Sequence, residues 1–194
     1  MKSPPRIQAP EITVVMPGLN EEKNIARAIL GVFRAFHDKG ISGELVVVDD
    51  GSVDRTPLIL RDLQASCPDL VVLCHERPSG IGGAFLAGSL KARGKAVVMI
   101  PGDNENRLED VLKFLDLLQH VDIIVPFVHN SELRNLPRRV ISSVYRFIIS
   151  FSFGTTLNYY NGTVIYRTRL LRSLRVRSRG FFYQAEILIR ALIS

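Results

Sequence analysis

The clearest pattern in this 194-residue sequence is Val46-Val47-Val48-Asp49-Asp50-Gly51-Ser52, an apolar run that ends in two carboxylates and a glycine turn. The run is typical of a buried β-strand, and the turn is typical of the loop that follows such a strand. Two interpretations of the carboxylates stay open from this stretch alone. Either one of them reaches the base or ribose of a bound nucleoside, or they form an Asx turn that caps the next helix.

Short apolar strands alternate with longer helical patterns on both sides of this stretch. Strands are expected at residues 12–16, 45–48, 70–73, 96–100 and 123–125, with a further strand at 163–166. Helices are expected from about residue 21, where Asn20 is the cap, and at 56–65, 85–93, 108–119, 137–153, 169–174 and 184–193. Repeated strand–helix alternation predicts an α/β fold with a mostly parallel central sheet and helices on both faces. The pattern changes after Pro126, so residues 1–126 and 127–194 are expected to be two halves of one domain.

Polar clusters follow several of the expected strands, at the edge where parallel sheets bind ligands. Asn20 and Glu21 follow the first strand, Asp49 and Asp50 the second, and Asp103 and Glu105 the fourth. Carboxylates gathered on one edge repel one another unless a cation or hydrogen-bond donors offset their charge. The convergence therefore favours a binding site over a set of unrelated turns.

The loops after the fourth and third expected strands each have two interpretations. In Pro101-Gly102-Asp103-Asn104-Glu105, the two carboxylates suit Mg²⁺ or Mn²⁺ bridging a diphosphate, or they belong to a turn followed by acidic helix-cap residues. In Gly80-Ile81-Gly82-Gly83, the glycines contact the phosphates or sugar of a donor, or they allow tight packing of the loop on a helix.

The net charge of +6 is unevenly distributed along the chain. Residues 1–130 hold 14 basic and 17 acidic side chains, whereas residues 131–194 hold 11 arginines and two acidic residues. The arginine-rich half is expected to meet phosphates or an anionic membrane surface, or to be a solvated basic face. Nucleic acid is not expected as a partner, because no recognition module accompanies the charge.

Other features limit the location of the protein. Cys67 and Cys74 lack the spacing of a disulfide framework or a zinc site, and the four histidines show no ligand spacing. The N-terminus is polar and proline-rich, unlike a secretory signal, and no apolar run approaches the roughly 20 residues that span a bilayer. We expect a cytoplasmic protein at the cytoplasmic face of a membrane. The 140–153 stretch either rests in the bilayer interface or packs on the domain. The last helix has no capping residue, which predicts that the native chain continues beyond Ser194.

Several motifs together resemble those of family 2 glycosyltransferases of the GT-A fold, in particular the dolichyl- or polyprenyl-phosphate sugar synthases. The family's opening motif is similar to Pro17-Gly18-Leu19-Asn20-Glu21, and its Val-Asp-Asp-Gly-Ser motif matches Val48 to Ser52. Its glycine-rich segment resembles residues 80–88, and its late motif resembles Gly180-Phe181-Phe182-Tyr183-Gln184-Ala185-Glu186. The 161–167 segment is similar to a further family stretch that ends in Arg167.

The resemblance implies nucleotide contacts from Pro17, Glu21 and Asp50, and a divalent metal at the 101–105 loop, where Pro101 replaces the family's first Asp. With their neighbours on the same loops, the predicted donor-binding residues are Pro17, Asn20, Glu21, Asp49, Asp50, Gly51, Ser52, Gly80 and Gly82. The predicted acceptor- or phosphate-binding residues are Arg134, Arg138, Arg139, Arg167 and Gln184. The predicted catalytic residues are Asp103 and Glu105, which hold the metal, and Glu186.

The implied activity is transfer of a sugar from a nucleotide-diphosphate donor to an acceptor, with inversion at the anomeric carbon. A polyprenyl phosphate acceptor is already ionised, whereas a hydroxyl acceptor needs a base, for which Glu186 is the available late acid unless it binds an arginine instead. The alternative is a non-catalytic domain that binds a nucleotide sugar or a membrane. A nicotinamide-dependent oxidoreductase is disfavoured, because the loop after the first strand lacks the glycine-rich phosphate turn.

Overall fold

A computed structural model of the chain describes residues 9–126 and 162–193. The front part contains β1 (Ile12–Gly18), α1 (Ile25–Lys39), β2 (Gly43–Asp49), α2 (Thr56–Gln64), β3 (Leu70–Cys74), α3 (Ile81–Lys91), β4 (Ala96–Met99), α4 (Glu109–Leu112), the 3₁₀ helix η1 (Leu115–Gln119) and β5 (Ile123–Ile124). The later part contains β6 (Ile165–Arg167), α6 (Thr168–Ser173) and α7 (Tyr183–Ile193). The expected helix at 137–153 lies outside the described residues.

Within the described residues, six strands form one sheet in the order β3-β2-β1-β4-β6-β5. The first four strands in the chain pair in parallel, as the sequence predicts. The strand β6 pairs antiparallel with both β4 and β5, so the later part of the chain completes the sheet. The two halves of the sequence therefore share one sheet.

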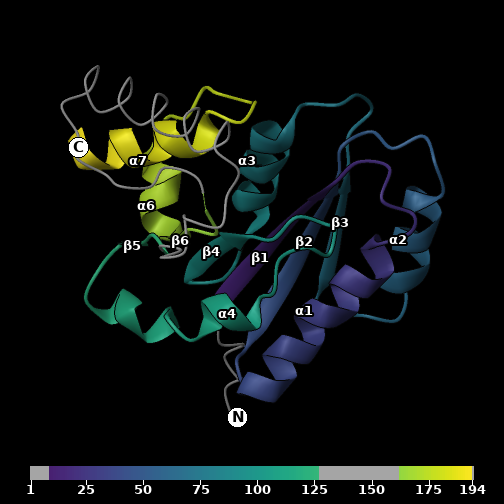
Figure 1. Cartoon of the computed structure of the whole chain (residues 1–194), viewed down its shortest axis with the longest axis horizontal. Coiled ribbons are helices and arrows are strands. Elements are labelled where there is room, and N and C mark those ends of the chain that lie inside the picture. The colour runs from purple at the N-terminus through teal and green to yellow at the C-terminus, as the bar shows by residue number, and fades with distance from the viewer. Residues whose placement is uncertain (1–8, 127–161, 194) are drawn as a thin grey trace, which may run out of the picture.

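Helices cover both faces of the sheet (Figure 1). On one face, α1, α2 and α4 pack against alternate strand residues such as Ile12, Val14 and Met16. On the other face, α3, α6 and α7 pack against intervening residues such as Val15 and Val46. Both sets of strand residues are fully buried, which explains why the strands are continuously apolar rather than alternating.

Three helix boundaries differ from the sequence-based expectation. Helix α1 begins at Ile25 rather than near residue 21, because Asn20 has a positive φ of 57° and belongs to the preceding loop. Helix α3 begins at Ile81 rather than Phe85, directly after Gly80, which has a φ of 81°. The expected helix 108–119 is divided into α4 and η1, because the backbone N–H of Leu117 bonds to Phe114 in the tighter 3₁₀ pattern.

No helix in residues 9–126 and 162–193 is both long and apolar enough to cross a bilayer.

Candidate functional site

The loops that follow β1, β2, β3 and β4 meet at one edge of the sheet, because parallel strands end on the same side. Backbone hydrogen bonds connect these loops directly. The N–H of Asp50 donates to the carbonyl of Gly18 at 2.9 Å, and the N–H of Gly102 donates to the carbonyl of Pro17 at 3.0 Å. The polar clusters of the first, second and fourth loops are therefore brought together, as the sequence predicts.

The loops after β1 and β2 are joined by side chains as well. The N–H of Asn20 donates to Ser52 Oγ at 2.8 Å, and Asn20 Oδ1 accepts from the N–H of Val53 at 2.9 Å. The N–H of Glu21 donates to Thr56 Oγ1 at 2.9 Å. The prediction that Asn20 caps α1 is wrong, because its side chain reaches across to the second loop instead. Asn20 and Ser52 thus fix the shape of this edge.

The two adjacent carboxylates of the second loop have different environments. Asp49 is buried, and its Oδ1 accepts from the N–H of Ser52 at 3.0 Å, a bond within the loop that does not reach α2, which begins at Thr56. Asp50 instead binds the loop after β3. Its Oδ1 accepts from the N–H and Oγ of Ser79, at 2.9 and 2.8 Å, and its Oδ2 accepts from the N–H of Gly80 at 2.9 Å.

His75 completes the environment of Asp50, with Nδ1 at 2.7 Å from Asp50 Oδ1 and 3.1 Å from Ser79 Oγ. Burial would raise the pKa of Asp50, but the hydrogen bonds from His75, Ser79 and Gly80 outweigh it and hold this pKa below its usual value. Asp50 is therefore ionised and anchors the third loop. No local pattern in the sequence marks His75 and Ser79 as partners of Asp50, since they lie 25 and 29 residues from it along the chain.

The glycines after β3 allow close packing. A Cβ added to Gly80 would lie 2.9 Å from the carbonyl oxygen of Arg179, and one added to Gly82 would lie 2.7 Å from the Cβ of Tyr183. The N–H of Gly83 also donates to the Arg179 carbonyl at 3.0 Å. The packing interpretation of these glycines is thus confirmed, and donor contacts from Gly80 and Gly82 stay a prediction.

The loop after β4 carries the predicted metal ligands. Asp103 Oδ1 accepts from the N–H of Glu105 at 3.0 Å, and Asn104 between them has a positive φ of 63°. Nowhere in the described ranges do three or more His, Cys, Asp or Glu side chains gather as a metal site. Mg²⁺, however, is often held by one or two carboxylates plus substrate phosphates. The exposed Glu105 and partly exposed Asp103 fit that mode of binding.

Arg167 lies at the opposite edge of the sheet from these loops, because it pairs with Ala96 at the start of β4. Its guanidinium contacts Asp122 at 2.8 Å and also donates to the carbonyls of Val121 and Leu118. This position gives no support to the prediction that Arg167 binds an acceptor phosphate. Its guanidinium instead ties β6 to the segment before β5.

Gln184 and Glu186 both hold backbone segments near the start of α7. The amide of Gln184 bonds to both the N–H and the carbonyl of Gly162. Glu186 accepts from the N–H groups of Ser178 and Arg177, the former at 2.7 Å, and from Arg190 Nε at 2.7 Å. Burial would raise the pKa of Glu186, but these hydrogen bonds lower it to about 2. So acidic a carboxyl is a weak base, and the geometry fits the arginine-binding alternative.

Arg134, Arg138 and Arg139, the other predicted phosphate-binding residues, lie outside the described residues, as does the 140–153 stretch.

A family model described as glycosyl transferase family 2 matches residues 13–178, which is most of the chain and includes all the loops above. The chain belongs to this family. The expectation drawn from the motifs of the first, second and third loops is thereby confirmed at the level of the family.

Curated relatives of this family 2 chain include enzymes named for lipid-phosphate substrates. The chain is 30% identical over 104 residues to a dolichyl-phosphate beta-glucosyltransferase of Trichomonas vaginalis. The matched region covers 51% of this chain and 32% of that protein. The chain is 27% identical over 175 residues to an undecaprenyl-phosphate 4-deoxy-4-formamido-L-arabinose transferase of Pectobacterium atrosepticum, covering 88% and 53%. The chain thus spans about a third to a half of the length of these relatives.

Solved structures with the same fold include glycosyltransferases. Glucosyl-3-phosphoglycerate synthase from Mycobacterium tuberculosis in complex with UDP has a TM-score of 0.67 at 22% identity, over 92% of this chain and 64% of that one. The S. aureus protein TarS, residues 1–349, in complex with UDP-GlcNAc has a TM-score of 0.64 at 23% identity, over 94% and 53%. These likenesses confirm the expected GT-A fold.

Proposed function

We propose that this chain is the nucleotide-sugar-binding part of a glycosyltransferase that moves a sugar from a nucleotide-diphosphate donor to a polyprenyl or dolichyl phosphate, with inversion. The observation that carries the proposal is the joining of four loops at one edge of the sheet of a family 2 chain. These loops carry ionised Asp50, buried Asp49 and the carboxylates of Asp103 and Glu105 at the same edge of the sheet.

The residues of this edge divide into those that shape it and those that remain available. Asn20, Ser52 and Asp50 use their polar atoms to hold the loops in place. Glu105 is exposed and Asp103 is partly exposed, so their carboxylate oxygens that accept no hydrogen bond within the loop are available to a divalent cation. Mg²⁺ or Mn²⁺ bound there would offset the negative charge that builds on the leaving diphosphate. The two carboxylates would therefore serve departure of the nucleotide.

The acceptor is proposed from two observations. Relatives of the chain carry names that specify dolichyl phosphate and undecaprenyl phosphate. In addition, Glu186, the late acid available as a base for a hydroxyl acceptor, has a pKa of about 2 and four hydrogen-bonded contacts. A phosphate acceptor needs no such base, because its oxygen is ionised before the reaction begins.

Calorimetric titration with UDP-glucose and UDP-GlcNAc in the presence of Mn²⁺ tests the donor site. We expect Asp103→Ala to bind the preferred donor about tenfold more weakly, because it removes a charged ligand of the metal. Asp116→Ala is the matched control, since Asp116 is an exposed carboxylate on η1, away from the four loops. Equal donor affinity in wild type and Asp103→Ala would refute the assignment.

A non-catalytic domain that binds nucleotide sugars is the alternative, and turnover separates the two. Wild-type protein is incubated with Mn²⁺, the donor that it binds and undecaprenyl phosphate, and release of the nucleoside diphosphate is measured. We expect release that depends on the lipid phosphate. Tight donor binding without release would favour the non-catalytic alternative.

A further inference from the structure

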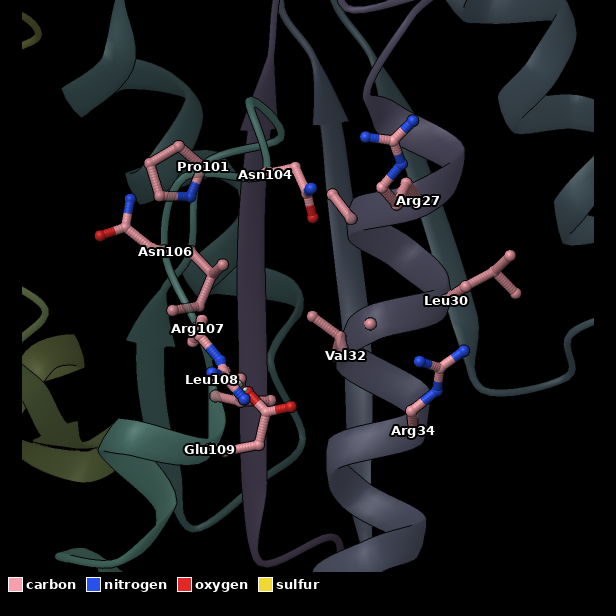
Figure 2. Close-up of a pocket in the computed structure, with 13 residues that line it drawn as sticks. Arg27, Leu30, Val32, Arg34, Pro101, Asn104, Asn106, Arg107, Leu108 and Glu109 are labelled. Atoms are coloured by element: carbon pink, nitrogen blue, oxygen red, sulfur yellow. Dashed lines mark ion pairs between the residues drawn. The ribbon is translucent and has the colours of Figure 1, made fainter.

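A groove of about 630 Å³ lies beside the sheet, between α1 and the segment that follows β4. Figure 2 shows its two walls, with Arg27 and Arg34 on α1 and with Pro101, Asn104 and Arg107 on the opposite segment. None of the α1 residues in this groove belongs to the proposed donor site. The α1 wall of the groove is therefore separate from the proposed donor site.

The α1 wall is basic and open. Arg27, Gly31 and Arg34 stand at positions i, i+4 and i+7, so they share one face of the helix. Both arginines are exposed, and neither forms an ion pair with any carboxylate in the described part of the chain. Gly31 leaves space between them, since a Cβ added there would meet no atom within 4 Å. Two unpaired guanidinium groups thus flank an empty position.

The opposite wall offers hydrogen-bond donors and little negative charge. Asn104 and Asn106 are among the lining residues, and the side chain of Asn104 lies between the loop and α1, whereas the amide of Asn106 points away from α1 (Figure 2). Glu109 is the one carboxylate among the lining residues, and it lies 3.8 Å from Arg107 Nε in an ion pair. The lining therefore carries an excess of two positive charges, which belong to Arg27 and Arg34.

We propose that this groove binds the phosphate group of a phosphorylated ligand, between Arg27 and Arg34. Guanidinium groups bind phosphate through charge-assisted hydrogen bonds, and the amide of Asn104 on the facing wall supplies a further donor group. Because Asn104 stands between Asp103 and Glu105, a ligand in the groove contacts the loop that carries the predicted metal ligands.

One glycine allows a test that changes only charge. Gly31→Glu places a carboxylate between the two arginines, whereas Gly31→Gln places a neutral group of the same shape there. Both variants should fold, because the added side chain meets open space and both residues favour helix more than glycine does. Circular dichroism melting curves check that they do.

The probe is inorganic pyrophosphate, titrated calorimetrically into the full chain in buffer with EDTA, so that no metal bridges it to Asp103 and Glu105. We expect binding by wild type and Gly31→Gln, and binding about tenfold weaker in Gly31→Glu, because its carboxylate occupies the arginines and repels the anion. The double variant with Arg27→Gln and Arg34→Gln should lose affinity similarly, and Arg61→Gln on α2 is its control. Absence of wild-type binding, or equal affinity in Gly31→Glu and Gly31→Gln, would overturn the proposal.

Flotation with vesicles then identifies the source of the phosphate. Phosphatidylcholine vesicles with and without phosphatidic acid are compared for wild type, Gly31→Gln and Gly31→Glu. Binding that needs phosphatidic acid, fails in Gly31→Glu and is displaced by pyrophosphate assigns the groove to a lipid headgroup. Pyrophosphate binding without vesicle binding assigns it to a soluble phosphorylated molecule. Because these variants leave Asp103 and Glu105 intact, failure here is distinguishable from failure of the donor-site test.

Discussion

Single residues at the functional edge act mainly by holding backbone in place. Glu186 is the clearest case, because its carboxylate closes the 177–178 segment onto the first turn of α7 and is only 12% exposed. The folded-state pKa of about 2 lies below the ordinary value of 4.5. The ionised carboxylate therefore stabilises the fold fully above pH 4.5, and this contribution is lost as the pH falls toward 2.

Glu186→Gln removes that contribution. We expect the free energy of unfolding at pH 7 to fall by roughly 3 kcal/mol, in line with the lowered pKa. The difference between wild type and variant should shrink steadily between pH 4.5 and pH 2, because wild-type Glu186 becomes protonated in that range. Urea unfolding at pH 7, 4 and 3 measures it. A difference that stays constant with pH would show that the hydrogen bonds do not depend on the charge.

Between elements, the close approach of α3 and α7 determines the position of the third loop. The first turn of α3 has glycine where a side chain would meet the backbone of Arg179 or the side chain of Tyr183. The rings of Phe85 and Tyr183, from the two helices, lie 5.3 Å apart on the same face of the sheet. The family's glycine-rich segment and its late aromatic motif thus meet in one contact.

Gly82→Ala tests this contact. The added Cβ would lie 2.7 Å from the Cβ of Tyr183, so one helix must shift. We expect a loss of about 2 kcal/mol in the free energy of unfolding, as is typical of overpacking. Gly31→Ala is the control, because its Cβ meets nothing within 4 Å, and it should gain up to about 1 kcal/mol from helix propensity. Thermal or urea unfolding of both variants gives the comparison, and equal effects would mean that α3 and α7 are loosely packed.

Across the whole molecule, the edge where the parallel strands end carries the functional loops, and the edge where they begin carries a structural network. The edge opposite the functional loops holds a buried polar network around Glu44, a fully buried carboxylate at the start of β2. Glu44 accepts from Thr13 Oγ1 at 2.6 Å and from Arg93 Nε at 2.6 Å, and also from the N–H of Arg93. Thr13 Oγ1 in turn accepts from the N–H of Gly94 at 2.9 Å. This network fastens β1 and β2 to the connection between α3 and β4.

Glu44→Ala separates stability from ligand binding. It leaves Thr13 and the N–H of Arg93 without their buried acceptor, so we expect a loss of roughly 3 kcal/mol in the free energy of unfolding. Donor affinity, measured by calorimetry well below the melting temperature, should remain within about twofold of wild type, because Glu44 lies at the far edge of the sheet. A large change in donor affinity would show that the two edges are coupled.

The sequence by itself determined the order of strands and helices, the parallel pairing of the first four strands and the gathering of polar loops at their carboxyl ends. These follow from local periodicity, since the apolar spacing of a strand or helix depends on neighbours a few residues apart. The tertiary structure decided which side chains remain available to a ligand and which hold the loops in place. Only packing brings His75 and Ser79 to Asp50, and Asn20 to the second loop, because these partners are 25 to 33 residues apart in the chain. Packing likewise places Arg167 at the far edge and surrounds Glu186 with donors, since hydrogen-bond partners are chosen by spatial proximity that local sequence does not encode.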